Sequence, residues 1–196
     1  MQSTRLQKQI SFLLEIDKMK TILRRNIILD KSKQEDDAEH SWHMAMMAMI
    51  LYEYAPKGTD LFRVLKMALV HDLVEVYAGD TFCYDQEANL DKAQREQQAA
   101  DKLFSMLEED QSRELRTLWE EFDRMDTPDS LYAGAIDRLQ PLLLNCHTQG
   151  HTWKLGPITS EDVYRRADPI RRASPKLWEY VDGMIQSCIQ SGLLPK

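Results

Sequence analysis

Apolar side chains recur at helical spacing along nearly the whole chain, and this periodicity limits the fold more than any other feature. In the first segment they trace one stripe, formed by Leu6, Ile10, Leu13, Leu14, Met19 and Leu23. Such spacing gathers side chains on one face of an α-helix. The chain has only 7 Gly and 7 Pro, and we find neither a hairpin signal nor a convincing alternation of apolar and polar residues. The sequence therefore predicts an all-α fold, a single helical bundle of about eight helices.

Local start and stop signals divide this pattern into separate helices. Four capping residues mark helix starts: Asp60, Thr127, Thr159 and Ser174. Pro128 and Pro175 stand at first helical positions, Gly79 at a helix end, and Pro141 is expected to kink its helix. The expected helices cover approximately residues 6–23, 40–54, 60–79, 91–108, 112–125, 127–150, a short stretch from 159, and 174–192.

Length and charge limit the classes of function. A chain of 196 residues can bury a hydrophobic core without the help of disulfides or structural metals, so we expect one domain over residues 1–196. The formal net charge of −7 argues against long nucleic acid as a partner, since that needs a basic surface. A small anionic substrate remains compatible, because a metal ion and a few arginines dominate the field inside a pocket.

The sequence also predicts a cytoplasmic protein without membrane association. No apolar run approaches the roughly 20 residues that a bilayer requires, and the first ten residues lack a signal-peptide core. The three cysteines, Cys83, Cys146 and Cys188, are widely spaced and form no CxxC pair. They are typical of reduced thiols, not of a disulfide framework or a zinc knuckle.

The dipeptide His71-Asp72 is the first candidate for chemistry. It lies in the apolar stretch ALVHDLVEVYAGD, where two ionisable groups are costly to bury unless something compensates them. A divalent metal would do so, because imidazole and carboxylate are both good ligands for first-row metals. Glu75 projects from nearly the same helix face and would add a carboxylate beside the ion. Alone, the dipeptide is weak evidence for a metal and favours a helix-terminal histidine that bonds to a neighbouring carboxylate.

Two further residues strengthen the metal hypothesis. His40 starts a separate helix in AEHSWHMA, behind an acidic residue that could orient its imidazole. Asp137 lies in the apolar stretch AGAIDRLQPLLL, where an unpaired carboxylate would be expensive. Three helices could therefore converge through His40, His71, Asp72 and Asp137.

This ordered set resembles the signature of the HD-domain phosphohydrolase superfamily, and more narrowly its 5′-nucleotidase branch, which acts on deoxynucleoside monophosphates. The resembling blocks extend from about Ile16 to Gly150 and read KMKTILRR, DDAEHSWHMA, LVHDLVEVYAGD, LWEEFD and AIDRLQPLLL. The resemblance implies an HD-domain bundle that binds one divalent transition metal (Mn, Co, Fe, Ni or Zn) through His40, His71, Asp72 and Asp137. It also implies a homodimer.

The same resemblance assigns the remaining site residues. Glu75 corresponds to the catalytic carboxylate that positions or deprotonates the attacking water, and Asp80 matches a second acidic residue of the site. Alternatively, Asp80 is a simple helix-exit residue. Arg24 matches the arginine that holds the substrate phosphate, a role that suits a guanidinium. Arg25 departs from the pattern, because the best-known bacterial nucleotidases of this branch carry a Trp there, which leaves the sugar preference open.

The other histidines have weaker claims to a metal. His43 forms an H-x-x-H pair with His40, but the family pattern does not require it, so we favour a supporting or packing role. His147 and His151 flank Gly150 at a helix exit, where the helix dipole alone favours a histidine.

The predicted reaction is metal-dependent hydrolysis of a small nucleotide-like phosphomonoester. Two alternatives remain open. One is an HD-fold enzyme with other chemistry, such as pyrophosphate removal from a guanosine nucleotide or oxidation at a di-iron centre. The other is a non-catalytic domain that binds a metal or senses a ligand. Fold analogy by itself does not identify the substrate.

Overall fold

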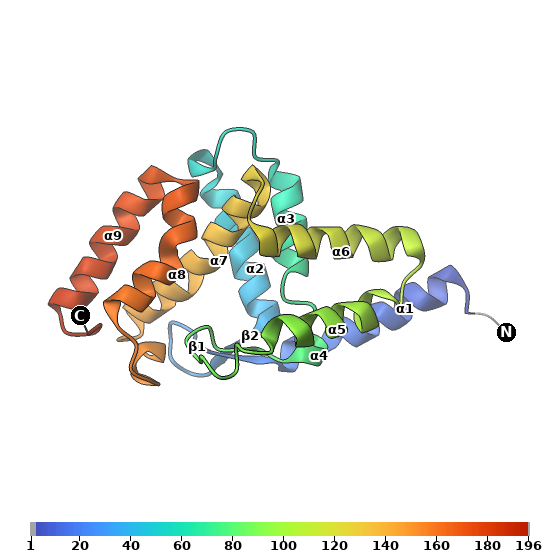
Figure 1. Cartoon of the computed structure of the whole chain (residues 1–196), viewed down its shortest axis with the longest axis horizontal. Coiled ribbons are helices and arrows are strands. Elements are labelled where there is room, and N and C mark those ends of the chain that lie inside the picture. The colour runs from blue at the N-terminus through green and yellow to red at the C-terminus, as the bar shows by residue number, and fades with distance from the viewer. Residues whose placement is uncertain (1–2, 196) are drawn as a thin grey trace.

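The computed structural model describes residues 3–195 and is predominantly helical (Figure 1). Within this range lie eight helices of 10 to 20 residues and one single-turn helix, α4. Their bounds are α1 (Arg5–Ile16), α2 (Asp37–Ile50), α3 (Leu61–Val70), α4 (Glu75–Ala78), α5 (Lys92–Phe104), α6 (Glu109–Arg124), α7 (Pro128–His147), α8 (Ser160–Ala173) and α9 (Pro175–Gln190). The all-α prediction is confirmed.

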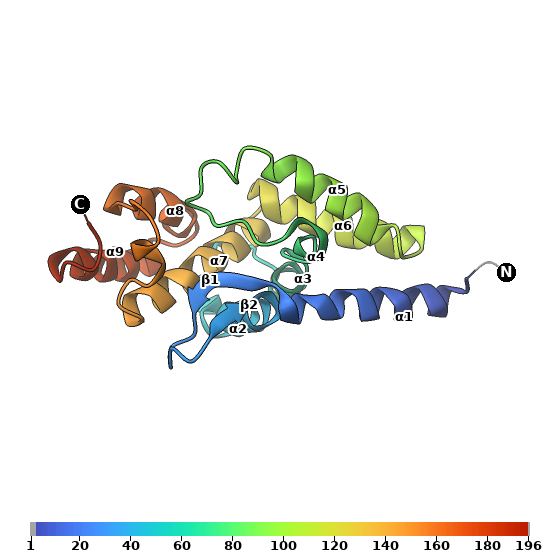
Figure 2. The same ribbon diagram turned by 90° about the horizontal axis from the view of Figure 1, so that it is seen from below.

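The first predicted helix is wrong beyond its first three turns. Helix α1 ends at Ile16, a 3₁₀ helix η1 covers Asp17–Thr21, and the chain then forms strand β1 (Leu23–Ile27). Strand β1 pairs antiparallel with β2 (Gln34–Asp36), a hairpin that the sequence reading did not predict. A tertiary contact supports it, because β1 packs against α7, while β2 leads directly into α2, as Figure 2 shows.

The third predicted helix, 60–79, is interrupted at the His-Asp dipeptide. Asp60 caps α3 as expected, accepting hydrogen bonds from the backbone N–H groups of Phe62 and Arg63. The helix nevertheless stops at Val70, and the next residues form a tighter turn in which the Glu75 N–H bonds to the Asp72 carbonyl at 2.9 Å. The chain then enters α4, which ends at Gly79 with a positive φ of 75°.

The other helix signals were read correctly, apart from their bounds. Thr127 and Thr159 form capping boxes at the starts of α7 and α8, and Ser174 caps α9. Helix α2 begins and ends earlier than predicted, because Asp36 forms a capping box with Glu39 and the chain turns 3₁₀ after Leu51. Helix α8, predicted to be short, has 14 residues. The kink at Pro141 stays a prediction.

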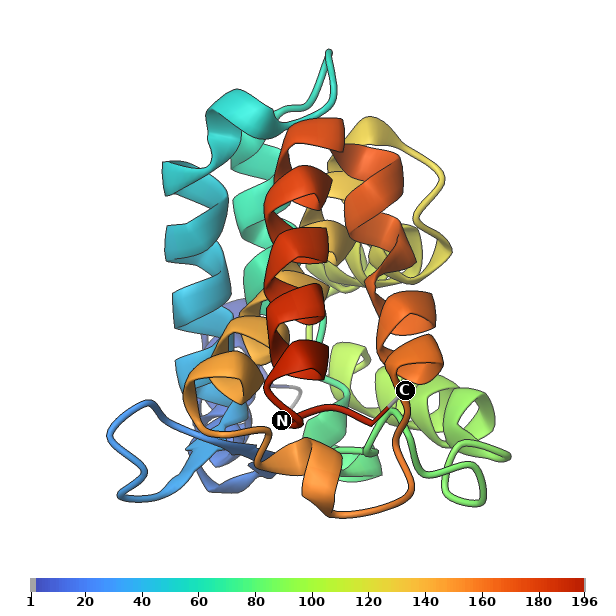
Figure 3. The same cartoon turned by 90° about the vertical axis from the view of Figure 1, so that its left-hand side faces the viewer.

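Helix α7 is the central element of the fold. It packs against α2, α3, α6 and α8, and α9 packs on the outside of α8 (Figure 3). Its side chains Tyr132 and Ile136 are fully buried, and the Tyr132 hydroxyl donates to the Ala48 carbonyl of α2 at 3.0 Å. A residue in the middle of α7 is therefore held rigidly against the neighbouring helices. No helix in residues 3–195 is both long enough and apolar enough to cross a membrane.

Candidate metal centre

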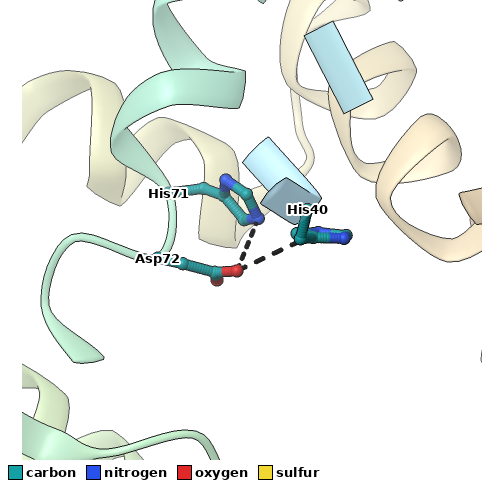
Figure 4. Close-up of side chains that lie close together, drawn as sticks. All are labelled: His40, His71 and Asp72. Atoms are coloured by element: carbon teal, nitrogen blue, oxygen red, sulfur yellow. Dashed lines mark ion pairs between the residues drawn. The ribbon is translucent and has the colours of Figure 1, made fainter. Parts of the chain in front are cut away.

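The structure brings together all four predicted metal ligands. His40 lies in the first turn of α2, His71 and Asp72 directly follow α3, and Asp137 lies in the middle of α7. Nitrogen or oxygen atoms of His40, His71 and Asp72 lie within 4.8 Å of one another (Figure 4). The Asp137 Oδ1 atom is 3.0 Å from His40 Nε2 and 3.6 Å from His71 Nε2. Three helices thus contribute to one cluster.

Both imidazoles direct the same ring nitrogen into this cluster. His71 Nδ1 lies 3.0 Å from the Ala68 carbonyl, and His40 Nδ1 lies 3.1 Å from Gln140 Oε1. Because backbone carbonyl and side-chain amide oxygens only accept hydrogen bonds, each Nδ1 carries the proton. In the neutral form of each ring the Nε2 lone pair then faces carboxylate oxygens, which is unfavourable without a proton or a metal cation between them. Among the described residues, buried His71 Nε2 has no well-directed hydrogen bond. This donor set fits a divalent metal ion.

The protonation equilibria of the cluster show the same need for positive charge. Burial opposes the charged form of His71, but Asp72 and Asp137 outweigh it and raise the pKa of this imidazole to about 10. Burial likewise opposes ionisation of Asp72, yet His71 and Arg24 hold the pKa of that carboxyl well below its usual value. A metal ion would replace the proton on His71, so binding should release protons.

A second group of carboxylates borders the first. Oxygens of Asp37, Glu75 and Asp80 lie within 4.8 Å of one another. Burial raises the pKa of all three carboxyls, that of Asp37 to about 7. Asp37 Oδ2 and Glu75 Oε2 are buried without hydrogen-bond partners in residues 3–195. Oxygen ligands of this kind could hold a hard cation, and the unpartnered Glu75 oxygen could instead bond to a water. Glu75 and Asp80 were predicted for the site.

Asp37 was missed in the sequence analysis. It stands in an acidic run that reads as a polar connection, but its side chain is fully buried. The available signal was the capping pattern of Asp36 and Glu39. It places the helix start nearer the N-terminus than predicted and brings Asp37 into the first turn of α2.

Arg24, the predicted phosphate ligand, lies at the junction of the two carboxylate groups. Its Nη1 atom donates to Asp72 Oδ2 at 2.7 Å and to Asp37 Oδ1 at 3.2 Å. The side chain is 13% exposed and lines the cavity next to the cluster. To bind a phosphate, Arg24 would have to exchange part of these contacts. Arg25 lines the same cavity and is exposed.

Residues outside the cluster hold His40 in place. Gln140 of α7 accepts from His40 Nδ1, and its amide nitrogen donates to Glu35 Oε1 at 2.5 Å. The same amide nitrogen lies 3.3 Å from His43 Nδ1. His43 thus contacts the residue that orients His40, in line with the supporting role expected for it. Gln140 and Glu35 were not singled out from the sequence, because neither a glutamine nor one acid in an acidic run is distinctive there.

The cavity beside the cluster has a volume of about 130 Å³. One wall is the segment between α4 and α5, which contributes Asp80, Phe82 and Tyr84. Five cationic side chains line the cavity: Arg24, Arg25, Lys92, Arg138 and Arg166. A concave site with convergent charged groups beside a cluster of potential metal ligands is typical of an active site.

Two of these arginines contact Asp137 on the side away from the histidines. The Arg138 guanidinium is hydrogen bonded to Asp137 Oδ2, and Arg166 Nη2 lies 3.9 Å from the same oxygen. Burial and the nearby Arg166 charge lower the pKa of Arg138 to about 10. Neither arginine was a predicted site residue.

Comparison with known proteins agrees with this geometry. A family model described as HD domain matches residues 16–178, which is most of the chain. The chain belongs to the HD-domain family. The pair His71-Asp72 stands at the end of α3 in this HD domain, at the centre of the ligand cluster.

Individual relatives support the same assignment. A solved structure named as a predicted metal-dependent phosphohydrolase from Magnetospirillum magnetotacticum MS-1 is similar with a TM-score of 0.94 and 44% identity, covering 98% of this chain and 96% of the other. The 5′-deoxynucleotidase HDDC2 of Homo sapiens is 27% identical over 68% of this chain and 65% of its own length. The HDDC2 of Danio rerio is 26% identical over 70% of this chain and 68% of its own length. The chain thus spans about two thirds of the curated relatives it matches.

Proposed function

We propose that this HD domain is a metal-dependent phosphomonoesterase, a 5′-nucleotidase that acts on ribo- or deoxyribonucleoside monophosphates. The observation that carries the proposal is that two imidazole Nε2 atoms and two carboxylates converge in the ligand cluster beside Glu75. The Oε2 atom of Glu75 lacks a hydrogen-bond partner among the described residues. The names of the HDDC2 relatives and of the Magnetospirillum protein support a reaction of this class.

His40, His71, Asp72 and Asp137 would hold one divalent ion, and their mixed nitrogen and oxygen donors suit Mn²⁺, Co²⁺, Fe²⁺, Ni²⁺ or Zn²⁺. When bound, the ion supplies Lewis acidity toward a phosphoryl oxygen and acidifies a water. The protein's own contribution is to hold these ligands rigidly on three helices and to shield the site from bulk solvent.

Glu75 would act as the general base. Burial and the neighbouring Asp72 and Asp37 charges raise its pKa well above the ordinary value, which makes the Glu75 carboxylate a stronger base toward a water than a solvent-exposed glutamate. Arg24 would bind the phosphate and stabilise charge on its equatorial oxygens. We assign to Asp80, in the same carboxylate group, the return of a proton to the leaving oxygen.

The test is phosphate release from a panel of ribo- and deoxyribonucleoside monophosphates by protein stripped of metal and reloaded with Mn²⁺ or Co²⁺. Glu75→Gln should keep its metal content but lose about 100-fold or more in kcat, the typical contribution of general base catalysis. Glu179→Gln, on the exposed surface of α9, is the matched control and should behave as wild type. Full activity of Glu75→Gln would contradict the assigned base.

Failure to release phosphate from any monophosphate would direct attention to the other chemistries of the fold. A pyrophosphohydrolase would release pyrophosphate from a polyphosphorylated nucleotide, and an oxygenase would bind two irons per chain. A non-catalytic domain would bind nucleotide without turnover under every metal.

Assembly and location are part of the same proposal. Helix α1 presents four large apolar side chains to solvent, Leu6, Ile10, Leu13 and Leu14, each between 48% and 71% exposed. We infer that residues 1–196 act as one domain and form a homodimer in the cytoplasm. In the dimer, the second copy of the chain would cover exposed apolar surface such as that of α1. Sedimentation analysis should give twice the chain mass of 22.9 kDa, and a single-chain mass at micromolar concentration would contradict the dimer.

A further inference from the structure

Asp137 divides its two carboxylate oxygens between opposite kinds of neighbour. Its Oδ1 atom faces His40 and His71 in the ligand cluster. Its Oδ2 atom faces two guanidinium groups, those of Arg138 and Arg166. Within residues 3–195, Asp137 is the only acidic ion-pair partner of either arginine. Two positive charges therefore share one negative charge, even before Oδ1 is engaged by a metal.

The proposed metal site makes this imbalance larger. An ion held by Asp137 and the other predicted ligands would draw electron density from the carboxylate, and this would weaken the attraction of Oδ2 for the two guanidinium groups. Arg138 cannot turn away, because its side chain is 11% exposed and its guanidinium lies over the Phe122 ring, 5.9 Å from the centroid. Arg166 is 40% exposed, and among residues 3–195 its ion pair is a 3.9 Å approach to Asp137, so it can reach a ligand.

Arg166 also stands where two cavities meet. The cavity beside the ligand cluster has a volume of about 130 Å³. This has room for a phosphate but is smaller than ligand pockets usually are. An adjoining cavity of about 650 Å³ shares Phe82, Cys83, Tyr84 and Arg166 with it. A substrate that is cleaved at the cluster can thus extend past Arg166.

The arginine expected to bind the cleaved phosphate is a different one. Arg24 contacts Asp72 and Asp37, whereas Arg138 and Arg166 contact Asp137. The basic residues therefore form two sets on two different carboxylates of the cluster. One phosphate does not require both sets, but a substrate with two phosphates does.

We infer that Arg166, backed by Arg138, forms a second anion subsite, and that the substrate is a nucleotide that carries a second phosphate besides the phosphomonoester that is cleaved. The inference rests on the proposed phosphomonoesterase function. A guanidinium fork suits this role, because it binds two phosphate oxygens at once. A second phosphate on the sugar leaves the cleaved bond a phosphomonoester, whereas in a 5′-diphosphate water would cleave the phosphoanhydride bond to the terminal phosphate and leave the monophosphate. The substrates of the test distinguish the two.

The experiment compares kcat/KM of the metal-loaded full chain for a deoxynucleoside 5′-monophosphate, the matching 3′,5′-bisphosphate and the 5′-diphosphate, with products separated by chromatography. We expect one of the doubly phosphorylated compounds to exceed the monophosphate at least about 10-fold. Arg166→Gln should raise KM for the doubly phosphorylated compound and lower its kcat/KM at least about 10-fold more than that for the monophosphate. Arg166→Lys should restore part of the advantage.

Arg171→Gln is the matched control, because Arg171 lies on the same helix, is 63% exposed and pairs with Asp168. Equal kcat/KM for all three substrates would overturn the second subsite and leave the proposed function intact. An equal loss for all three substrates in Arg166→Gln would also overturn it, since Arg166 would then bind the cleaved phosphate. Release of phosphate from none of them would remove the proposed function together with this inference.

Discussion

At the scale of single residues, the orientation of two imidazole rings decides what the cluster can bind. The Ala68 carbonyl fixes the tautomer of His71, and the Gln140 side chain fixes that of His40. Gln140 can do so because its amide nitrogen is engaged by Glu35, which leaves its oxygen as the acceptor. A glutamine that touches no substrate thereby controls a ligand lone pair.

Replacing Gln140 should therefore weaken metal binding. Gln140→Leu keeps the size of the side chain but removes the acceptor for His40 Nδ1, and we expect the affinity for Mn²⁺ or Co²⁺ to fall about 10- to 100-fold. Isothermal titration of the metal-free protein measures this, with Gln98→Leu on the exposed face of α5 as the control. An unchanged dissociation constant would show that His40 does not depend on Gln140.

At the scale of helices, a buried carboxylate joins three elements on the side of α6. Glu121 of α6 accepts from Arg63 Nε of α3 at 3.2 Å and from the hydroxyl of Thr127, the N-cap of α7, at 2.7 Å. The hydrogen bond from Arg63 holds the pKa of Glu121 below the ordinary value of 4.5. The ionised form thus stabilises the junction of α3, α6 and α7.

The stabilisation by Glu121 should depend on pH in a defined direction. Because the folded-state pKa is lowered, the contribution is complete above about pH 4.5 and is lost as the pH falls through the folded-state value. Glu121→Gln should lower the free energy of unfolding by about 1–2 kcal/mol at pH 7, given that Arg63 is partly exposed. Urea denaturation of the metal-free proteins at pH 7 and at pH 3.5 should show the difference shrinking at the lower pH. A constant difference would contradict the ionic interaction.

The cavity wall between α4 and α5 depends on one side chain of α5. Arg95 donates to the carbonyls of Ala78 and Ala88, each at 2.9 Å, and to Thr81 Oγ1 at 3.1 Å. A segment with few regular backbone hydrogen bonds opens easily unless such contacts hold it.

Arg95→Ala should loosen this wall without affecting the metal. We expect faster hydrogen exchange over residues 79–91 and a KM raised roughly 3- to 10-fold, because the wall that positions the substrate is less ordered. Arg113→Ala, on the exposed surface of α6, should change neither quantity. Protection of residues 79–91 equal to wild type would argue that other contacts hold the segment.

At the scale of the whole molecule, the cluster joins α2, the end of α3 and α7, so metal binding and folding are coupled. Metal at 100 times its dissociation constant adds about 2.7 kcal/mol to the stability of a state that alone binds it. For a chain of this length we expect Tm to rise by roughly 5–11 °C over the stripped protein. Differential scanning calorimetry measures this, and Asp72→Ala should lose the shift. The same shift in Asp72→Ala would mean that the ion binds elsewhere.

The sequence by itself determined the helices whose signals are local, and it predicted the four residues that the fold brings into one cluster. Caps such as Asp60, Thr127 and Thr159 act on backbone groups two or three residues away, so they can be read without knowledge of the fold. These four residues could be predicted as ligands because charged residues in apolar helical stretches need compensation, and because their order along the chain resembles a known family.

Only the tertiary structure decided the features that depend on contacts between distant segments. The hairpin of β1 and β2 has no strong local signal, and its Asn26 side chain reaches the Pro141 carbonyl of α7 at 3.4 Å. Asp37 is buried because Arg24 neutralises it from β1. Arg166 lines the cavity beside Asp137 only because α8 packs along α7. In each case the free energy comes from a partner far along the chain, and local sequence patterns carry no record of that partner.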